Sequence, residues 1–368
     1  MNNKNEFTEI EKKVYINNIQ KIQSLNENQI KKICSVLKPY LLKFFLILII
    51  SSSFLIVFYF KFNIDSIETK YNRIIRNYNE FIIDTEFYNY ERNFITEDMK
   101  KFAEWDQVEN EPYFINGIIR KYKPKNCLEI GVSKGGGSII ILNAIKDIND
   151  SSLISLDIDE QLYNNRSQKT GCNVKKYFPE LAENNKWKLF TGEQPHIFLD
   201  KLNKKFDFLF LDTVHLTPGE LINIIEVLPF LNENAIIILH DIMFHLPSHS
   251  YYNPLEIKYH PSMIYLLTSL EGKKYIIKHQ KFGFENICAI FLKQNQEKYY
   301  LNYFLLLTSP WDYMPSNVQI LQLKHFIMKY YKKDIFINIF NRAVKENRIY
   351  IKKVEKLKNT IKANIANN

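Results

Sequence analysis

The 368-residue sequence predicts an α/β protein with a Rossmann-like, doubly wound sheet of seven strands, most of them parallel. From Asn126 onward, short apolar runs alternate with amphipathic stretches, a pattern typical of strands and helices in turn. Such alternation gives a parallel sheet with helices on both faces. Two later apolar runs flank a glycine-containing turn and are expected to close the sheet as an antiparallel hairpin. The expected parallel strands are 126–131, 153–158, 187–191, 207–212 and 234–240, and the hairpin strands are 273–279 and 286–293.

An apolar run near the N-terminus predicts one transmembrane helix. Residues 44–60 carry no charge and, with two leucines shortly before them, reach the length that spans a bilayer. A polar stretch of about forty residues precedes them, which is unlike a cleaved signal peptide. A buried core helix is the alternative for the apolar run. We expect a polar segment at 1–40, a transmembrane helix at 41–60 and a helical stalk or cap at 61–111.

Composition and charge narrow the classes of function. The four cysteines are scattered and form no CxxC pair, so neither a zinc site nor a disulfide framework is indicated. Much of the net charge of +9 lies in residues 341–368, within a helical extension expected at 294–368. Apolar residues recur there at helical spacing, and the resulting basic amphipathic helix either lies on anionic lipid or packs on the domain. Basic and aromatic residues do not interleave, so no nucleic-acid partner is expected.

A glycine-rich turn follows the first expected strand in the stretch "CLEIGVSKGGGSIIIL". The strand ends at Gly131 and a helix begins near Gly136, which brings backbone N–H groups to the carboxyl edge of the sheet. The spacing is neither that of a dinucleotide-binding GxGxxG turn nor that of a P-loop, which disfavours a nicotinamide cofactor and a triphosphate. Asp157 ends the second strand, where a carboxylate can hold the hydroxyls of a ribose. These features together indicate an adenosine ligand.

The motifs "LEIGVSKGGGS" and "ISLDID" resemble motif I and the second-strand acid of class I S-adenosylmethionine-dependent methyltransferases. The resemblance covers a domain at 112–293 and implies S-adenosylmethionine as the cofactor. It implies that Glu129 approaches the methionine end, that Asp157 holds the ribose, and that Gly192 and Glu193 flank the adenine. The residues implied in cofactor binding are Glu129, Gly131, Gly135, Gly136, Ser138, Asp157, Gly192 and Glu193.

Acidic and imidazole groups follow the fourth and fifth expected strands, in "FLDTVH" and "LHD". Asp212 and Asp241 could converge on one divalent cation, and oxygen ligands suit Mg²⁺. This arrangement is similar to that of metal-binding O-methyltransferases of the catechol and macrolide-sugar types. An Asn follows the second Asp in the catechol type, whereas Ile242 does here, so the third ligand stays open. His215, His240, His245 or water could supply it.

A hydroxyl group is a poor nucleophile until its proton is removed. A bound cation can lower its pKa, and His215 or His240 can act as a general base. We therefore expect His215, His240 and Asp212 to be catalytic, with His215 preferred as the base. Thr217 to Glu220 has the form of a capping box for the next helix. The aromatic, His-rich and Pro-rich segment 243–262 is expected to cover the substrate site.

The sequence thus predicts a membrane-anchored O-methyltransferase that acts on a sugar, a glycolipid or another small hydroxylated molecule. Because the cofactor is made in the cytosol, the catalytic domain is expected to be cytoplasmic. The alternative is an inactive, methyltransferase-like membrane scaffold, for which Ile242 is the best support. The oligomeric state stays open.

Overall fold

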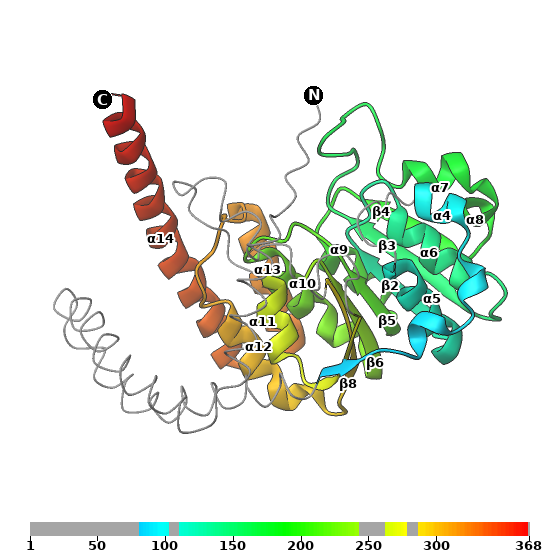
Figure 1. The fold of residues 1–368 in the computed structure, drawn as a ribbon. Coiled ribbons are helices and arrows are strands. Elements are labelled where there is room, and N and C mark those ends of the chain that lie inside the picture. The colour runs from blue at the N-terminus through cyan, green and yellow to red at the C-terminus, as the bar shows by residue number, and fades with distance from the viewer. Residues whose placement is uncertain (1–80, 103–109, 243–261, 278–285, 367–368) are drawn as a thin grey trace, which may run out of the picture. The chain divides into compact units, whose positions relative to one another are not determined.

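The computed structural model describes residues 81–102, 110–242, 262–277 and 286–366 (Figure 1). Contacts divide the chain into two compact units, residues 1–75 and 76–368. All of the described residues belong to the second unit.

One mixed sheet of eight strands forms the centre of this unit, in the order β1-β7-β8-β6-β5-β2-β3-β4. The strands from β2 to β6 pair in parallel, and β8 runs antiparallel to both β6 and β7. The predicted parallel core and closing hairpin are therefore present. The strands are β1 (Phe81–Ile83), β2 (Asn126–Ile130), β3 (Ser152–Asp157), β4 (Trp187–Thr191), β5 (Phe206–Leu211), β6 (Leu231–His240), β7 (Gly272–Ile276) and β8 (Ile287–Leu292).

The prediction of seven strands is wrong, because β1 adds an eighth at the edge of the sheet. β1 has three residues and pairs in parallel with β7, with Phe81 opposite Lys274. It lies within the segment predicted as a helical stalk or cap. The structure places after it two short 3₁₀ turns and helix α4 (Glu97–Phe102). This part of the chain also supplies buried residues such as Phe87 and Met99 to the core.

Both faces of the central strands are apolar, which is why these strands appear in the sequence as continuous hydrophobic runs. In β5, Phe208 and Phe210 pack on one side of the sheet and Leu209 and Leu211 on the other. Each buried side chain of this kind contributes about 1.5–3 kcal/mol to stability. A strand with two apolar faces must be covered by helices on both sides.

Two helical layers cover the sheet. One layer consists of α4, α5 (Glu111–Tyr122), α6 (Gly136–Ile145), α7 (Cys172–Tyr177) and α8 (Pro179–Glu183). The other contains α9 (Pro195–Leu202), α10 (Gly219–Val227), α11 (Ser262–Ser269), α12 (Tyr300–Leu306), α13 (Asn317–Tyr331) and α14 (Asp334–Ala366). In Figure 1 the sheet lies between the layers, with α5 and α6 on one side and α10 to α12 on the other.

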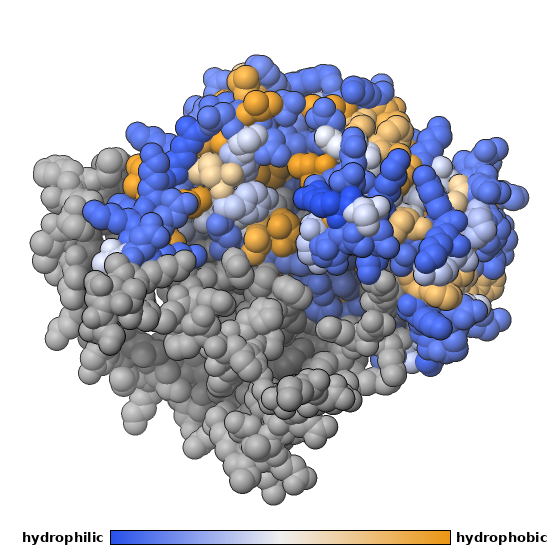
Figure 2. Space-filling view, turned by 90° about the horizontal axis from the view of Figure 1, so that it is seen from above, coloured by the Kyte–Doolittle hydropathy of each residue, from blue (hydrophilic) through white to orange (hydrophobic). Residues whose placement is uncertain are grey.

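The C-terminal helices belong to the core of the domain over much of their length. Trp311, Phe336 and Phe340 are buried in the same cluster as the sheet residues. From Lys352 to Thr360, helix α14 is exposed apart from the half-buried Val354. The face shown in Figure 2 is mainly hydrophilic, with hydrophobic residues scattered over it.

The prediction of a transmembrane helix is wrong for the described part of the chain. Across the described ranges of the chain, no helix combines the length and the apolar character that crossing a bilayer requires. The run 41–60 on which the prediction depended lies outside the described residues.

Candidate active site

The carboxyl ends of the parallel strands form the candidate active site. β2 to β6 end at one edge of the sheet, where open α/β sheets bind ligands. Gly131, just after β2, lies against Asp212, just after β5. A Cβ atom at Gly131 would lie 1.8 Å from the carbonyl oxygen of Asp212, and the φ angle of +86° also favours glycine. This glycine therefore brings two of the predicted binding segments together.

The glycine turn is braced by its own neighbours. Asp157 Oδ2 accepts hydrogen bonds from two successive backbone N–H groups of the turn, at 2.8 and 3.1 Å. Gly135 is the N-cap of α6, and a Cβ added there would lie 2.5 Å from the Val174 side chain. Gly136 is the first residue of the helix. Close packing thus accounts for bare backbone in the turn, and the ribose-binding role of Asp157 stays a prediction.

Glu129 is fully buried beneath the turn. Its Oε2 accepts hydrogen bonds from Ser138 at 2.5 Å and Ser155 at 2.6 Å, and Oε1 has no hydrogen-bond partner within the described part of the chain. Burial raises the pKa of this carboxyl from 4.5 to about 8, and Asp212 and Asp157 add to the effect while the two hydroxyls oppose it. A cationic ligand group near Oε1 would lower this pKa and favour the carboxylate.

The loop after β4 lies beside the end of β3. Gly192 donates its backbone N–H to the carbonyl oxygen of Asp157 at 3.1 Å, and the neighbouring Glu193 is exposed. A cavity of about 480 Å³, whose lining includes Leu189 and Thr191, opens at this end of the sheet. Neither Gly192 nor Glu193 is among the residues that line this cavity, and their role beside the adenine stays a prediction.

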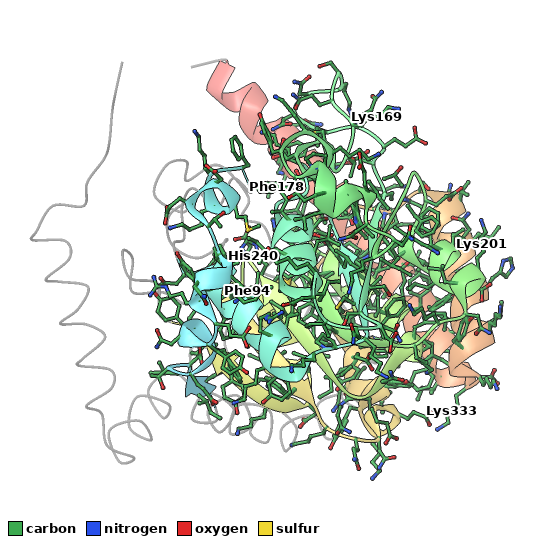
Figure 3. All side chains as sticks on the ribbon, turned by 90° about the vertical axis from the view of Figure 1, so that its right-hand side faces the viewer. Phe94, Lys169, Phe178, Lys201, His240 and Lys333 are labelled. Atoms are coloured by element: carbon green, nitrogen blue, oxygen red, sulfur yellow. The ribbon has the colours of Figure 1, made fainter. Side chains whose placement is uncertain are left out.

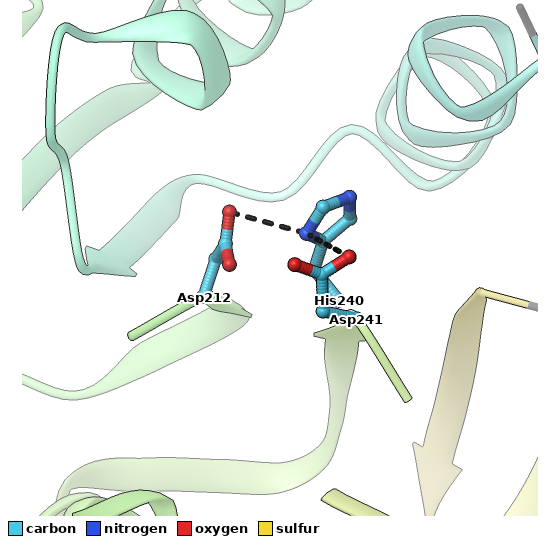
Figure 4. A group of neighbouring side chains, drawn as sticks. All are labelled: Asp212, His240 and Asp241. Carbon is cyan, nitrogen blue, oxygen red and sulfur yellow. Dashed lines mark ion pairs between the residues drawn. The ribbon is translucent and has the colours of Figure 1, made fainter. Parts of the chain in front are cut away.

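Asp212, His240 and Asp241 form a cluster at the ends of β5 and β6 (Figure 4). His240 Nδ1 lies 3.2 Å from Asp212 Oδ2 and 3.6 Å from Asp241 Oδ1. One potential ligand atom of each residue lies within 4.8 Å of the other two. In Figure 3, His240 lies among the inner side chains, whereas Lys201 and Lys333 lie at the rim. The two predicted metal-binding aspartates therefore converge, with an imidazole beside them.

His215 reaches the same cluster from the loop after β5. Its Nε2 lies 3.2 Å from Asp241 Oδ2 and 3.5 Å from Asp212 Oδ1. Its Nδ1 lies 3.7 Å from Oε1 of Glu220, which also accepts a hydrogen bond from the His215 backbone. His215 and Asp241 have φ angles of 56° and 55°. Such angles are costly for residues other than glycine and are concentrated at functional sites.

Sequence reasoning missed Glu111 and Asn286. Glu111, the first residue of α5, is 1% exposed and lies 2.9 Å through Oε2 from His240 Nε2. Asn286 Nδ2 donates to Glu111 Oε1 at 3.1 Å and to Asp241 Oδ1 at 2.8 Å. An acidic residue at the start of an otherwise apolar helix, followed by Pro112, was the available signal for Glu111. Asn286 carried no local signal, because it only precedes a strand.

The charges of the cluster stabilise one another. Burial alone would raise the pKa of Asp212, but His240 and His215 hold it below its usual value. Burial likewise opposes protonation of His240, yet Asp212, Glu111 and Asp241 raise its pKa well above 6.5. Without a metal ion, the surrounding carboxylates therefore favour the protonated form of His240.

One detail of the predicted site is wrong. Thr217 and Glu220 do not form a capping box, since Thr217 Oγ1 donates to the Pro310 carbonyl and Glu220 instead accepts from His215. Ile242 is buried in the core, so it leaves the third ligand position to another group. His245 and the segment 243–261, which was expected to cover the substrate, lie outside the described residues.

The fold and the site together define a class of protein. A mostly parallel, doubly wound sheet carries a glycine turn, a second-strand acid and a cluster of aspartates and histidines at one edge. This combination is that of an α/β enzyme that binds a nucleoside-containing ligand.

Comparison with known proteins identifies the class more closely. Residues 128–242, which run from β2 to the residues just after β6, match the family model of a methyltransferase domain. This match covers less than half of the chain and agrees with the resemblance to class I methyltransferases that the motifs indicated. No curated protein matches the sequence.

Several solved structures are similar over about half of the chain. The methyltransferase PaMTH1 of Podospora anserina, bound to S-adenosylhomocysteine, is 17% identical over 54% of this chain and 89% of its own, with a TM-score of 0.39. The O-methyltransferase TomG of Streptomyces achromogenes, in complex with S-adenosylmethionine, is 15% identical over 54% and 91%, with a TM-score of 0.39. The O-methyltransferase of Bacillus cereus, in complex with S-adenosylhomocysteine, is 13% identical over 53% and 89%, with a TM-score of 0.36.

Proposed function

We propose that this protein is an S-adenosylmethionine-dependent O-methyltransferase that methylates a hydroxyl group of a sugar, a glycolipid or another small molecule. The meeting of Asp212, His215, His240 and Asp241 beside the glycine turn carries this proposal. A hydroxyl acceptor requires removal of its proton, and this cluster offers both a base and carboxylates for a cation. The sugar or glycolipid class comes from the resemblance to macrolide-sugar enzymes.

The chain's own residues would bind the cofactor along the carboxyl edge of the sheet. Asp157 fixes the backbone of the glycine turn and would accept hydrogen bonds from the ribose hydroxyls. Glu129 has an unpaired, buried Oε1 that would face the cationic methionine end. Gly192 and Glu193 would border the adenine. These donors and acceptors are the reason why the site suits S-adenosylmethionine.

The acid-base step would use His215. As the acceptor oxygen bonds to the methyl carbon, the carbon–sulfur bond breaks, and the hydroxyl proton passes to His215 Nε2. Glu220 lies behind the opposite ring nitrogen, at 3.7 Å, and would stabilise the imidazolium that forms. The loop backbone at His215 is bonded to the same glutamate, which fixes the position of the ring.

Asp212 and Asp241 would hold a divalent ion next to this base. Their carboxylates approach one imidazole from neighbouring strand ends, which gives a donor set suited to a divalent cation. Such an ion, when bound, would lower the pKa of a hydroxyl that coordinates it. The two aspartates would also fix the acceptor beside His215.

The cofactor assignment is tested by isothermal titration of the purified protein with S-adenosylhomocysteine. Micromolar binding is expected for the wild type and for the surface variant Glu346→Gln, and a loss of at least tenfold is expected for Asp157→Ala. Circular dichroism verifies that the Asp157 variant is folded. If folded wild-type protein does not bind, the methyltransferase proposal fails.

The acceptor is tested by transfer of a labelled methyl group to a panel of sugars, nucleotide sugars and glycolipids. His215→Asn is expected to lower the rate about 10²–10⁴-fold, the range of general-base catalysis. His325→Asn, on the exposed face of α13, is the matched control and should retain full activity. Cofactor binding without transfer to any hydroxyl acceptor would favour the inactive scaffold.

A further inference from the structure

We infer that His240 is a metal ligand through Nδ1, held in place by Glu111, and that the site therefore selects a first-row transition ion over Mg²⁺. The inference rests on the proposed function, because it concerns the divalent ion expected between Asp212 and Asp241. It goes beyond that function by adding a nitrogen ligand, a positioning residue and a class of metal.

The distances between side-chain atoms in the cluster match the distances between ligand atoms that bind one metal ion. His240 Nδ1 lies 3.2 and 3.6 Å from the nearest oxygens of Asp212 and Asp241. Ligands that bind one ion at about 2.1 Å are separated by roughly 3.0 Å at octahedral angles and roughly 3.4 Å at tetrahedral angles. His240 Nδ1 is thus at ligand-to-ligand distance from both carboxylates, and one ligand atom of each residue lies within 4.8 Å of the others.

Glu111 determines which nitrogen of His240 is available. Its Oε2 lies 2.9 Å from His240 Nε2, and its Oε1 accepts a hydrogen bond from Asn286. Because both oxygens act as acceptors, Nε2 carries the proton of a neutral ring, and the lone pair lies on Nδ1. That nitrogen is the one that faces Asp212 and Asp241. A carboxylate behind the distal nitrogen is the usual support of a metal-binding histidine.

Asn286 completes this support. Its side-chain amide donates to both Glu111 and Asp241, and its backbone carbonyl oxygen accepts from the backbone N–H of Ile242 at 3.1 Å. The starts of α5 and β8 are thereby tied to the end of β6. The amide thus orients the ligand Asp241.

A nitrogen ligand changes the preference for the metal. Mg²⁺ takes oxygen ligands in nearly regular octahedra, whereas imidazole suits Fe²⁺, Co²⁺, Ni²⁺ and Zn²⁺ and is also bound by Mn²⁺. Two carboxylates and one imidazole leave coordination positions for an acceptor oxygen and water. The charge and geometry of the donor set therefore favour a transition ion that keeps open positions.

The test measures binding of Mn²⁺, Co²⁺ and Mg²⁺ to the full-length protein, with Mn²⁺ also observed by pulsed electron paramagnetic resonance. We expect Mn²⁺ and Co²⁺ to bind at least about tenfold more tightly than Mg²⁺, and Mn²⁺ to show coupling to an imidazole ¹⁴N nucleus. His240→Asn should remove the coupling. Glu111→Ala should weaken Mn²⁺ binding about 10–100-fold, and the isosteric Glu111→Gln should restore part of the loss.

The controls separate this inference from the proposed function. His325→Asn and Glu346→Gln are exposed matched changes and should leave metal affinity and the ¹⁴N coupling unchanged. If the wild type binds none of the three ions, both the ion of the proposed function and the inference are wrong. If it binds Mn²⁺ without ¹⁴N coupling, prefers Mg²⁺, or keeps the coupling in His240→Asn, the ion site stands and the inference is overturned.

Discussion

Replacing Glu129 with Gln should change how the stability of this protein depends on pH. Glu129 is fully buried and accepts hydrogen bonds from two serine hydroxyls. Gln keeps the size of the side chain and one acceptor oxygen, but it cannot ionise. The variant therefore isolates the cost of a carboxylate in the core beneath the glycine turn.

The magnitude follows from the pKa of Glu129, which burial raises from 4.5 to about 8 in the folded protein. Between these values the folded protein holds a proton that the unfolded chain has lost, so wild-type stability falls as the pH rises. The slope is at most about 1.4 kcal/mol per pH unit. The free energy of unfolding of Glu129→Gln relative to that of the wild type should therefore rise by about 3.5 kcal/mol between pH 5 and pH 8.

Urea denaturation of both proteins, followed by tryptophan fluorescence at several pH values, measures this difference. Glu346→Gln is the matched control, because Glu346 is exposed and pairs with Arg342 at the surface. Its difference from the wild type should not vary with pH. A difference between Glu129→Gln and the wild type that stays constant within about 0.5 kcal/mol across the range would refute the reasoning.

Three further outcomes are expected. Gly131→Ala should lower the free energy of unfolding, measured by urea denaturation, by about 3 kcal/mol or more, because the new Cβ would lie 1.8 Å from the Asp212 carbonyl oxygen. Gly192→Ala should lower it less, because there the new Cβ would meet the Glu160 side chain at 3.0 Å. Trp311→Ala should cost about 3–5 kcal/mol in the same assay, since the indole is fully buried and donates to a backbone carbonyl. Chelation of divalent ions should lower the midpoint of thermal unfolding. Mn²⁺ at a hundred times its dissociation constant should restore about 2.7 kcal/mol of the free energy of unfolding. An unchanged midpoint would contradict the proposed ion site.

The parallel core of the fold could be predicted because its strands are buried on both faces. Such strands give continuous apolar runs, and the structure places their ends within a few residues of the predicted positions, as in β4 (Trp187–Thr191). β1 could not be found in this way. It has three residues, with Ile83 49% exposed, and its pairing with Lys274 joins segments that are far apart in the sequence. A strand this short forms only when it pairs with another strand, and the sequence pattern does not indicate which strand that is.

The positions of Asp212 and Asp241 could be predicted, because residues that follow neighbouring parallel strands meet at one edge of the sheet. The roles of the histidines could not be separated from sequence, since His240 ends one strand and His215 lies in the loop just after the neighbouring strand. The structure separates them by their outer partners. His240 has Glu111 at 2.9 Å, and His215 has Glu220 at 3.7 Å together with a backbone bond to the same acid.

The sequence did not identify Glu111 and Glu220 as partners of the site histidines, and the reason is the same for both. Glu111 and Glu220 lie in the first turns of α5 and α10, where an acid is already explained by the helix dipole or by a cap. Capping acids usually stay at the surface, whereas the exposed fractions here are 1% for Glu111 and 0% for Glu220. A buried carboxylate needs a strong donor, because removing it from water is costly without one. Glu111 Oε2 lies 2.9 Å from His240 Nε2, and Glu220 accepts hydrogen bonds from the His215 backbone N–H and from Ser262. Burial, which the sequence does not report, therefore links these two helices to the segments that carry the histidines of the candidate site.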